Sequence, residues 1–161
     1  MKLLALALLI PAILLTSGCG KKDDHAGHDH SAGKDDHDHG HAHAAKMGGQ
    51  LVEIGSHDFN LELLRDGTSG KLTLWVLDAH AENFVRLTNE TLVVEVADAG
   101  KIETVVLKAT ANPATGEKAG DTSQFEALSD AFKTAKPLAV RVPSLQIGSR
   151  QFSVRTFDLK K

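Results

Sequence analysis

Residues 20–46 limit what this chain can fold into, because they contain no side chain that can build a core. The stretch consists only of glycine, alanine, serine, aspartate, lysine and histidine. A segment of this composition buries too little apolar surface to offset the conformational entropy lost on folding, so we expect a disordered linker. A folded domain must therefore come from residues 47–161.

The residues before this linker are typical of a secretory signal. A positively charged start precedes an apolar run over residues 3–15, which is too short to span a bilayer. The run leads into Thr-Ser-Gly-Cys at residues 16–19, which resembles the lipobox of bacterial lipoproteins. The resemblance implies that residues 1–18 are removed and that Cys19 carries the acyl chains that anchor the protein in a membrane. By the same resemblance, Gly20, in place of an aspartate after the cysteine, favours sorting to the outer membrane, with the protein facing the periplasm. The alternative to a lipoprotein is an ordinary signal peptide with an incidental cysteine.

Residues 47–161 carry the pattern of an all-β domain. Short apolar-rich runs alternate with turn residues at a spacing of about ten residues, which is typical of an immunoglobulin-like β-sandwich of about seven or eight strands. Only residues 129–135 favour a helix, of two turns at most. The single cysteine excludes an internal disulfide, so packing must hold the domain together. The expected strands cover residues 51–54, 58–65, 71–78, 91–97, 102–108, 123–128, 137–142 and 150–159.

The linker is rich in histidine. Together with Cys19 it forms a predicted tether over residues 19–46. Imidazole is the commonest side-chain ligand of Zn²⁺, Ni²⁺, Co²⁺ and Cu²⁺, and a flexible chain can wrap to supply the four donors that zinc requires. We therefore predict overlapping sites for a divalent transition metal, zinc before nickel, cobalt or copper(II). The alternative is a polar spacer whose histidines are incidental. The predicted ligands of this histidine tract are His25, His28, His30, His37, His39, His41 and His43.

A second candidate site follows from the expected register of the hairpin after residue 57. If Arg65 pairs with Gly70, one face of the hairpin is wholly apolar, His57 lies directly across from Asp78, and His80 follows two residues later. Two imidazoles and a carboxylate at one end of the inward face can hold a metal ion with an open position. A hydrogen-bonded His57–Asp78 pair that closes the end of the sandwich is the alternative.

Other function classes are disfavoured. The chain has no Gly-x-Ser-x-Gly turn, no His-Glu-x-x-His motif and no phosphate-binding glycine loop, so we expect neither an enzyme nor an organic cofactor. The formal net charge is −3 and no run of lysine or arginine stands out, which disfavours nucleic acid as a partner.

Residues 48–57, Gly-Gly-Gln-Leu-Val-Glu-Ile-Gly-Ser-His, followed by Leu-Glu-Leu at 61–63, resemble the small N-terminal β-domain of the cobalt–zinc–cadmium type periplasmic efflux adaptors. In that family a histidine-rich segment can precede a similar strand. Residues 74–80 also look like the strand and turn of several immunoglobulin-like periplasmic domains. The likeness covers roughly residues 48–110, and the chain lacks the helical hairpin and lipoyl-type domain of an adaptor. It implies a stand-alone metal-handling domain beside a metal-efflux component.

Two hypotheses follow. In the first, a periplasm-facing lipoprotein binds, buffers or delivers divalent transition metal through its histidine tract. In the second, the β-sandwich binds a protein partner and the tract is only a tether. A metal titration with and without the tract histidines separates them.

Overall fold

The computed structural model of the chain describes residues 43–160. The predicted signal peptide, the lipidation site Cys19 and all predicted tract ligands except His43 lie outside the described residues. These ligands are His25, His28, His30, His37, His39 and His41.

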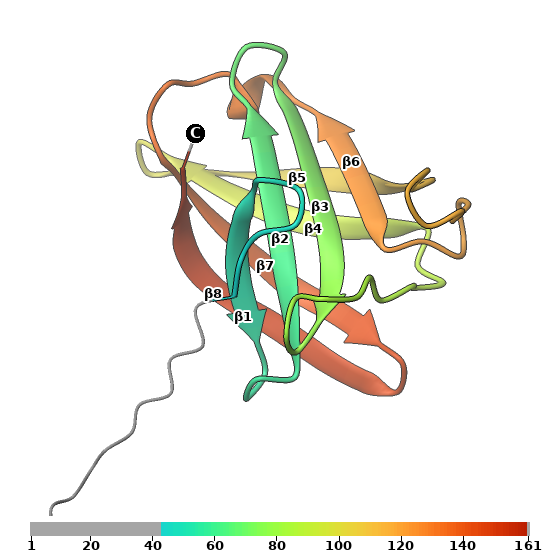
Figure 1. Cartoon of the computed structure of the whole chain (residues 1–161). Helices are drawn as coiled ribbons and strands as arrows, with labels where there is room; N and C mark the ends of the chain where they lie inside the picture. The colour runs from blue at the N-terminus through green and yellow to red at the C-terminus, as the bar shows by residue number, and fades with distance from the viewer. Residues whose placement is uncertain (1–42, 161) are drawn as a thin grey trace, which may run out of the picture. The chain divides into compact units, whose positions relative to one another are not determined.

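The described residues form an all-β domain of eight antiparallel strands, which confirms the predicted fold class and strand number (Figure 1). The helix expected over residues 129–135 is a single 3₁₀ turn, η1 (Asp130–Phe132), in which the Ser129 hydroxyl accepts a hydrogen bond from the backbone N–H of Ala131. The strands are β1 (Gln50–Ile54), β2 (Phe59–Asp66), β3 (Lys71–Asp78), β4 (Thr91–Asp98), β5 (Lys101–Thr110), β6 (Gln124–Leu128), β7 (Leu138–Ile147) and β8 (Arg150–Leu159).

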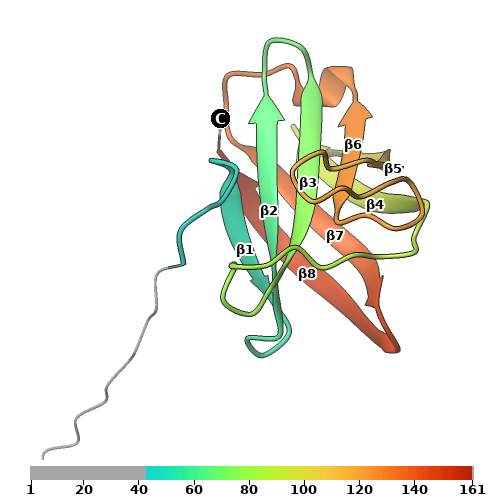
Figure 2. The same ribbon diagram turned by 45° about the vertical axis from the view of Figure 1, so that its right-hand side comes forward.

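The eight strands form one continuous sheet that folds over on itself, in the order β1-β2-β3-β6-β5-β4-β7-β8. Figures 1 and 2 show β1, β2, β3 and β6 in one layer, with β5, β4, β7 and β8 crossing behind them at an angle. The two layers make the predicted β-sandwich, and the pairing of β6 with β5 joins them along one side.

The core lies between the layers and follows the period of the strands. In β4, Leu92, Val94 and Val96 are buried, while the residues between them are partly exposed. This alternation is that of a strand with one face on a core. Phe125 of β6 and Phe132 of η1 are fully buried in the same cluster, so the 3₁₀ turn contributes to the core.

The strands β2 and β3 are buried on both faces, which the sequence pattern did not predict. One face meets the core. The other faces residues 43–49, whose N–H groups bind Glu62, and the loop over residues 79–90, which hydrogen-bonds to Asn60 and to β3. Ser123, at the end of the loop over residues 111–123, accepts a hydrogen bond from Val76 of β3. Residues with polar groups that we expected on the face of the hairpin opposite the apolar one are therefore buried. They are Asn60, Glu62, Thr73 and Trp75.

The hairpin loop between β2 and β3 is shifted by one residue from the predicted one. Asp66 pairs with Lys71 and Arg65 with Leu72, whereas the predicted register pairs Arg65 with Gly70. The Asp66 carboxylate accepts a hydrogen bond from the backbone N–H of Thr68 at 2.8 Å, and Gly70 adopts a left-handed φ of 76°. Asp66 thereby ends the strand and caps the loop, as aspartate often does in turns.

This shift changes what lies across from the candidate histidines. Strand partners move by two positions, so the same residues still share the apolar face, but Asp78 pairs with Phe59. Extending the observed register places His57 level with His80. The predicted pairing of His57 with Asp78 is therefore wrong.

The two edge strands of the sheet, β1 and β8, meet through Gln50. Its side-chain Nε2 donates to the carbonyl oxygen of Asp158 at 2.9 Å, and its Oε1 accepts from the backbone N–H of Lys160 at 3.0 Å. A side-chain amide offers the same donor and acceptor as a peptide group. Gln50 thus bridges the edges, and the sheet is nearly closed.

We expect Gln50→Leu to loosen this closure. Each lost hydrogen bond contributes about 0.5–1.5 kcal/mol, so the free energy of unfolding should fall by about 1–3 kcal/mol. Amide hydrogen exchange should accelerate in β1 and at the end of β8. Gln146→Leu is the matched control, because the Gln146 amide bonds only to Gly148 in its own turn. Equal effects of the two variants would contradict the bridging role.

Candidate functional site

A buried carboxylate fixes the segment that leads into β1. Glu62 on β2 is fully buried, and its oxygens accept hydrogen bonds from the backbone N–H groups of Lys46 at 2.8 Å, Met47 at 2.7 Å and Gly49 at 2.8 Å. Donors of this kind compensate the cost of burying a charge. The Lys46 ammonium also donates to the carbonyl oxygen of Glu82 at 2.6 Å. The end of the predicted tether therefore lies against the β-domain.

Two glycines allow this segment to pass so close to β2. Gly48 has a left-handed φ of 79°, which glycine adopts without strain. A Cβ on Gly49 would lie 2.6 Å from the carbonyl oxygen of Leu63. The Gly-Gly pair is therefore a steric requirement of the Glu62 contact.

The turn between β1 and β2 presents His57. Gly55 and His57 both have a left-handed φ, of 70° and 67°. A side chain at Gly55 would collide with Asp58, whose carboxylate is bound by both terminal nitrogens of Arg150 at 2.6 and 2.7 Å. Histidine in this region costs of order 1–3 kcal/mol, and such strain clusters at functional sites. The turn is held tightly enough to keep His57 in this conformation.

The turn after β3 presents His80. The Asp78 carboxylate accepts from the backbone N–H of Glu82 at 2.8 Å and from the Asn83 side chain at 2.7 Å. The buried Asn60 amide donates to the carbonyl oxygen of Asp78 at 3.0 Å. Burial raises the pKa of Asp78, but the hydrogen bonds from Asn83 and backbone N–H groups outweigh it, so this pKa lies below 3.8. Both oxygens of Asp78 are used in the turn.

Three histidines meet at this end of the sheet: His43, His57 and His80, the histidine cluster. The Nε2 atoms of His43 and His57 are 3.4 Å apart, and their ring centroids are 5.5 Å apart. The ring centroids of His43 and His80 are 5.8 Å apart. Glu53 Oε2 lies 2.8 Å from His57 Nδ1, and the side chains of His57 and Glu53 are 48% and 46% exposed. The cluster is open to solvent.

The cluster differs from the predicted second site in three ways. Asp78 is not part of it, and the carboxylate that contacts His57 is Glu53. His57 and His80 are exposed at the rim of the domain and not on its inward face. His43, predicted as a tract ligand, lies with the two domain histidines. The only sequence signal for the contact is the four-residue spacing of Glu53 and His57. This spacing brings the two side chains together only because the chain turns tightly between them.

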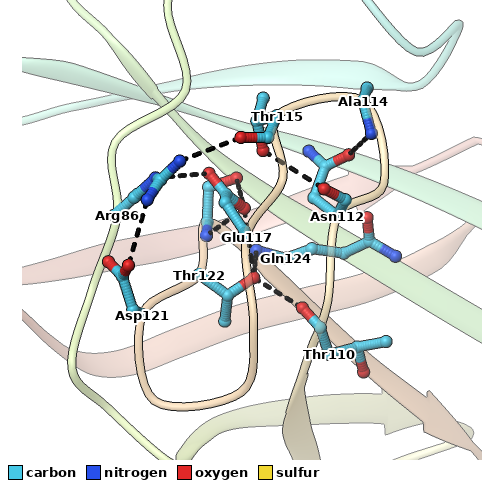
Figure 3. Close-up of polar contacts among 10 residues, drawn as sticks. Arg86, Thr110, Asn112, Ala114, Thr115, Glu117, Asp121, Thr122 and Gln124 are labelled. Atoms are coloured by element: carbon cyan, nitrogen blue, oxygen red, sulfur yellow. Dashed lines mark hydrogen bonds and ion pairs between the residues drawn. The ribbon is translucent and has the colours of Figure 1, made fainter.

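A second polar cluster surrounds Glu117, which is buried (Figure 3). Its Oε2 accepts from the backbone N–H and the hydroxyl of Ser123 at 2.8 and 2.9 Å. Arg86 Nε lies 3.6 Å from Oε1, and Arg86 also donates to the Thr115 carbonyl oxygen and to Asp121. Because the guanidinium balances the buried carboxylate and bonds the surrounding loop, we assign this cluster a structural role.

Comparison of the chain with protein-family models, curated proteins and solved structures gave no significant match. Within residues 43–160, no group of three or more histidine, cysteine, aspartate or glutamate side chains is placed to hold a metal ion. No helix of this part of the chain is long and apolar enough to cross a membrane. The histidine cluster is therefore the main pointer to function. The likeness to efflux adaptors stays a prediction.

We expect Glu62→Gln to release residues 43–49 from the domain. The amide offers one acceptor oxygen in place of two and turns an NH₂ group toward backbone N–H donors. The variant should lose about 1–3 kcal/mol of unfolding free energy, measured by urea denaturation. Hydrogen exchange at Lys46, Met47 and Gly49 should accelerate. Glu90→Gln, which removes the same charge at an exposed position, should leave both quantities unchanged.

Asp58 should contribute to the acid sensitivity of the domain. Its hydrogen bonds with Arg150 hold the pKa of the Asp58 carboxyl below its ordinary value of 3.8. This contribution is present above that value and is lost as pH falls through the lower folded-state pKa. Between about pH 4 and pH 2, Asp58→Asn should therefore lose less stability than the parent. Arg150→Gln should flatten the same limb, and the double variant should add nothing further; independent effects would contradict the pairing.

Proposed function

We propose that this chain is a periplasm-facing lipoprotein that binds divalent transition metal, zinc first, through its histidine tract and buffers or delivers it near the membrane. The observation that carries the proposal is the position of His43. The Nε2 atom of this last tract histidine lies 3.4 Å from His57 Nε2, and its ring centroid lies 5.8 Å from that of His80. The tract therefore ends in a cluster of the same ligand type.

The surroundings of the cluster support a role in metal exchange. The β1–β2 turn and the turn after β3 hold His57 and His80 at one end of the sheet, and Glu62 holds the segment that carries His43. Exposed imidazoles can take up and release an ion, whereas a closed structural site keeps its metal. A lipid anchor at Cys19 would confine the bound ions to the membrane surface. A metal-efflux component is the partner that this arrangement suits.

An interaction lipoprotein is the second candidate, favoured by one observation. Val106 on β5 and Leu128 on β6 are 50% and 74% exposed. Extending the register of these strands places the two residues level with each other. Exposed apolar residues that lie side by side can form part of a docking surface for a protein. In that case, replacing the tract with a Gly/Ser linker of equal length should leave the phenotype unchanged.

A zinc titration of the full-length protein in detergent tests the proposed function. We compare the parent with a tract variant in which His25, His28, His30, His37, His39 and His41 are replaced by asparagine. The parent should bind several zinc ions at micromolar or lower concentration, and the tract variant should lose all but one of them. Isothermal titration calorimetry gives both stoichiometries. An unchanged stoichiometry would reject the tract as the binding element.

A further inference from the structure

We propose that His43, His57 and His80 bind one divalent transition metal ion, with His43 and His57 coordinating through Nε2 and Glu53 acting as the hydrogen-bond partner of His57. The inference rests on the proposed function and specifies one site within it. This site would join the end of the tract to the β-domain, and it draws its ligands from three separate segments.

Glu53 sets the orientation and tautomer of His57. Its Oε2 accepts from His57 Nδ1 at 2.8 Å, and in the neutral ring this contact leaves the lone pair on Nε2. Histidines that bind metals generally donate their other ring N–H to a carboxylate or carbonyl in this way. The available Nε2 is the atom that faces His43.

The distance between the two Nε2 atoms fits a shared metal ion. With Zn–N bonds of about 2.0–2.1 Å in a tetrahedron, two nitrogen ligands lie about 3.3–3.4 Å apart. The observed separation of His43 Nε2 and His57 Nε2 is 3.4 Å. The separation of the two nitrogens thus matches that of two ligands on one tetrahedral ion.

His80 supplies the third ligand by a side-chain rotation. Imidazoles on one tetrahedral ion have ring centroids roughly 5 Å apart, and His80 is 5.8 Å from His43. In residues 43–160 no group of three such side chains is placed to hold a metal ion, so ligation by His80 requires its ring to move toward the other two. His80 is exposed, so its ring is not buried in the core. Three histidines leave a fourth position open for water or for a ligand from a donor or acceptor protein.

A direct hydrogen bond between His43 and His57 is the competing explanation of their contact. It requires a proton on one Nε2, whereas the metal site requires none on either. The two explanations differ in whether the domain retains a zinc site once the other tract histidines are gone.

The decisive experiment uses the full-length tract variant with its six asparagines and Zn²⁺ or Co²⁺ as the probe. We expect one equivalent of zinc, and with Co²⁺ the intense visible absorption of a tetrahedral site. Adding His57→Asn should abolish both, because asparagine tolerates the left-handed φ but provides no imidazole. Ser56→Asn, in the same turn, is the matched control and should retain the site. Glu53→Gln should weaken binding by about 10–100-fold.

The outcomes are separable. If the tract variant binds no zinc, or binds it equally with and without His57→Asn, the site is overturned whatever the tract does. If the tract variant binds as many ions as the parent, the proposed function fails, while the loss on His57→Asn still decides the site. Should His57→Asn unfold by circular dichroism, His43→Gln replaces it, since His43 precedes the first strand and its loss leaves the sheet intact. His43→Gln and His80→Gln should each reduce affinity at least tenfold.

Discussion

The contacts of the buried Glu62 carboxylate fix the end of the domain that carries the histidine cluster. The carboxylate gathers three backbone N–H groups of residues 46–49 and so fixes where the chain enters the sheet. Without that contact His43 would have no defined position relative to His57 and His80. The same contact explains the two adjacent glycines, because one needs a left-handed φ and the other has no room for a Cβ. A polar residue on β2 thus determines the geometry of a histidine cluster at the rim.

The strand pattern was predictable because alternation and turn residues are local properties of a sequence. Eight expected runs became eight strands, with ends that moved by a few residues. The burial of Glu62 and Trp75 was not predictable, because long loops that cover an outer face leave no periodic signal. The register of β2 with β3 was missed for a different reason. A shift of two residues preserves both faces, so hydrophobicity alone cannot distinguish the alternatives; the Asp66 cap decides between them.

The candidate site was likewise predictable in part. Histidine identity pointed to His43, His57 and His80 separately, and the sequence assigned His43 to a tether and the other two to a domain. Their proximity depends on the Glu62 contact and on a left-handed turn at His57, neither of which follows from spacing. Asp78 was predicted as a ligand because the expected register placed it directly across from His57, two residues before His80. Strand-ending aspartates also cap turns, and hydrogen bonds to Glu82 and Asn83 show that this one does.

The bridging of β1 and β8 by Gln50 has a consequence for how copies of this domain meet one another. A sheet with two free edges exposes rows of unpaired N–H and C=O groups that can recruit the edge of a neighbouring copy. In this domain the first and last strands of the sheet are turned toward each other and joined by one side-chain amide. The bridge therefore leaves a neighbouring copy fewer open backbone groups for strand exchange than two free edges would.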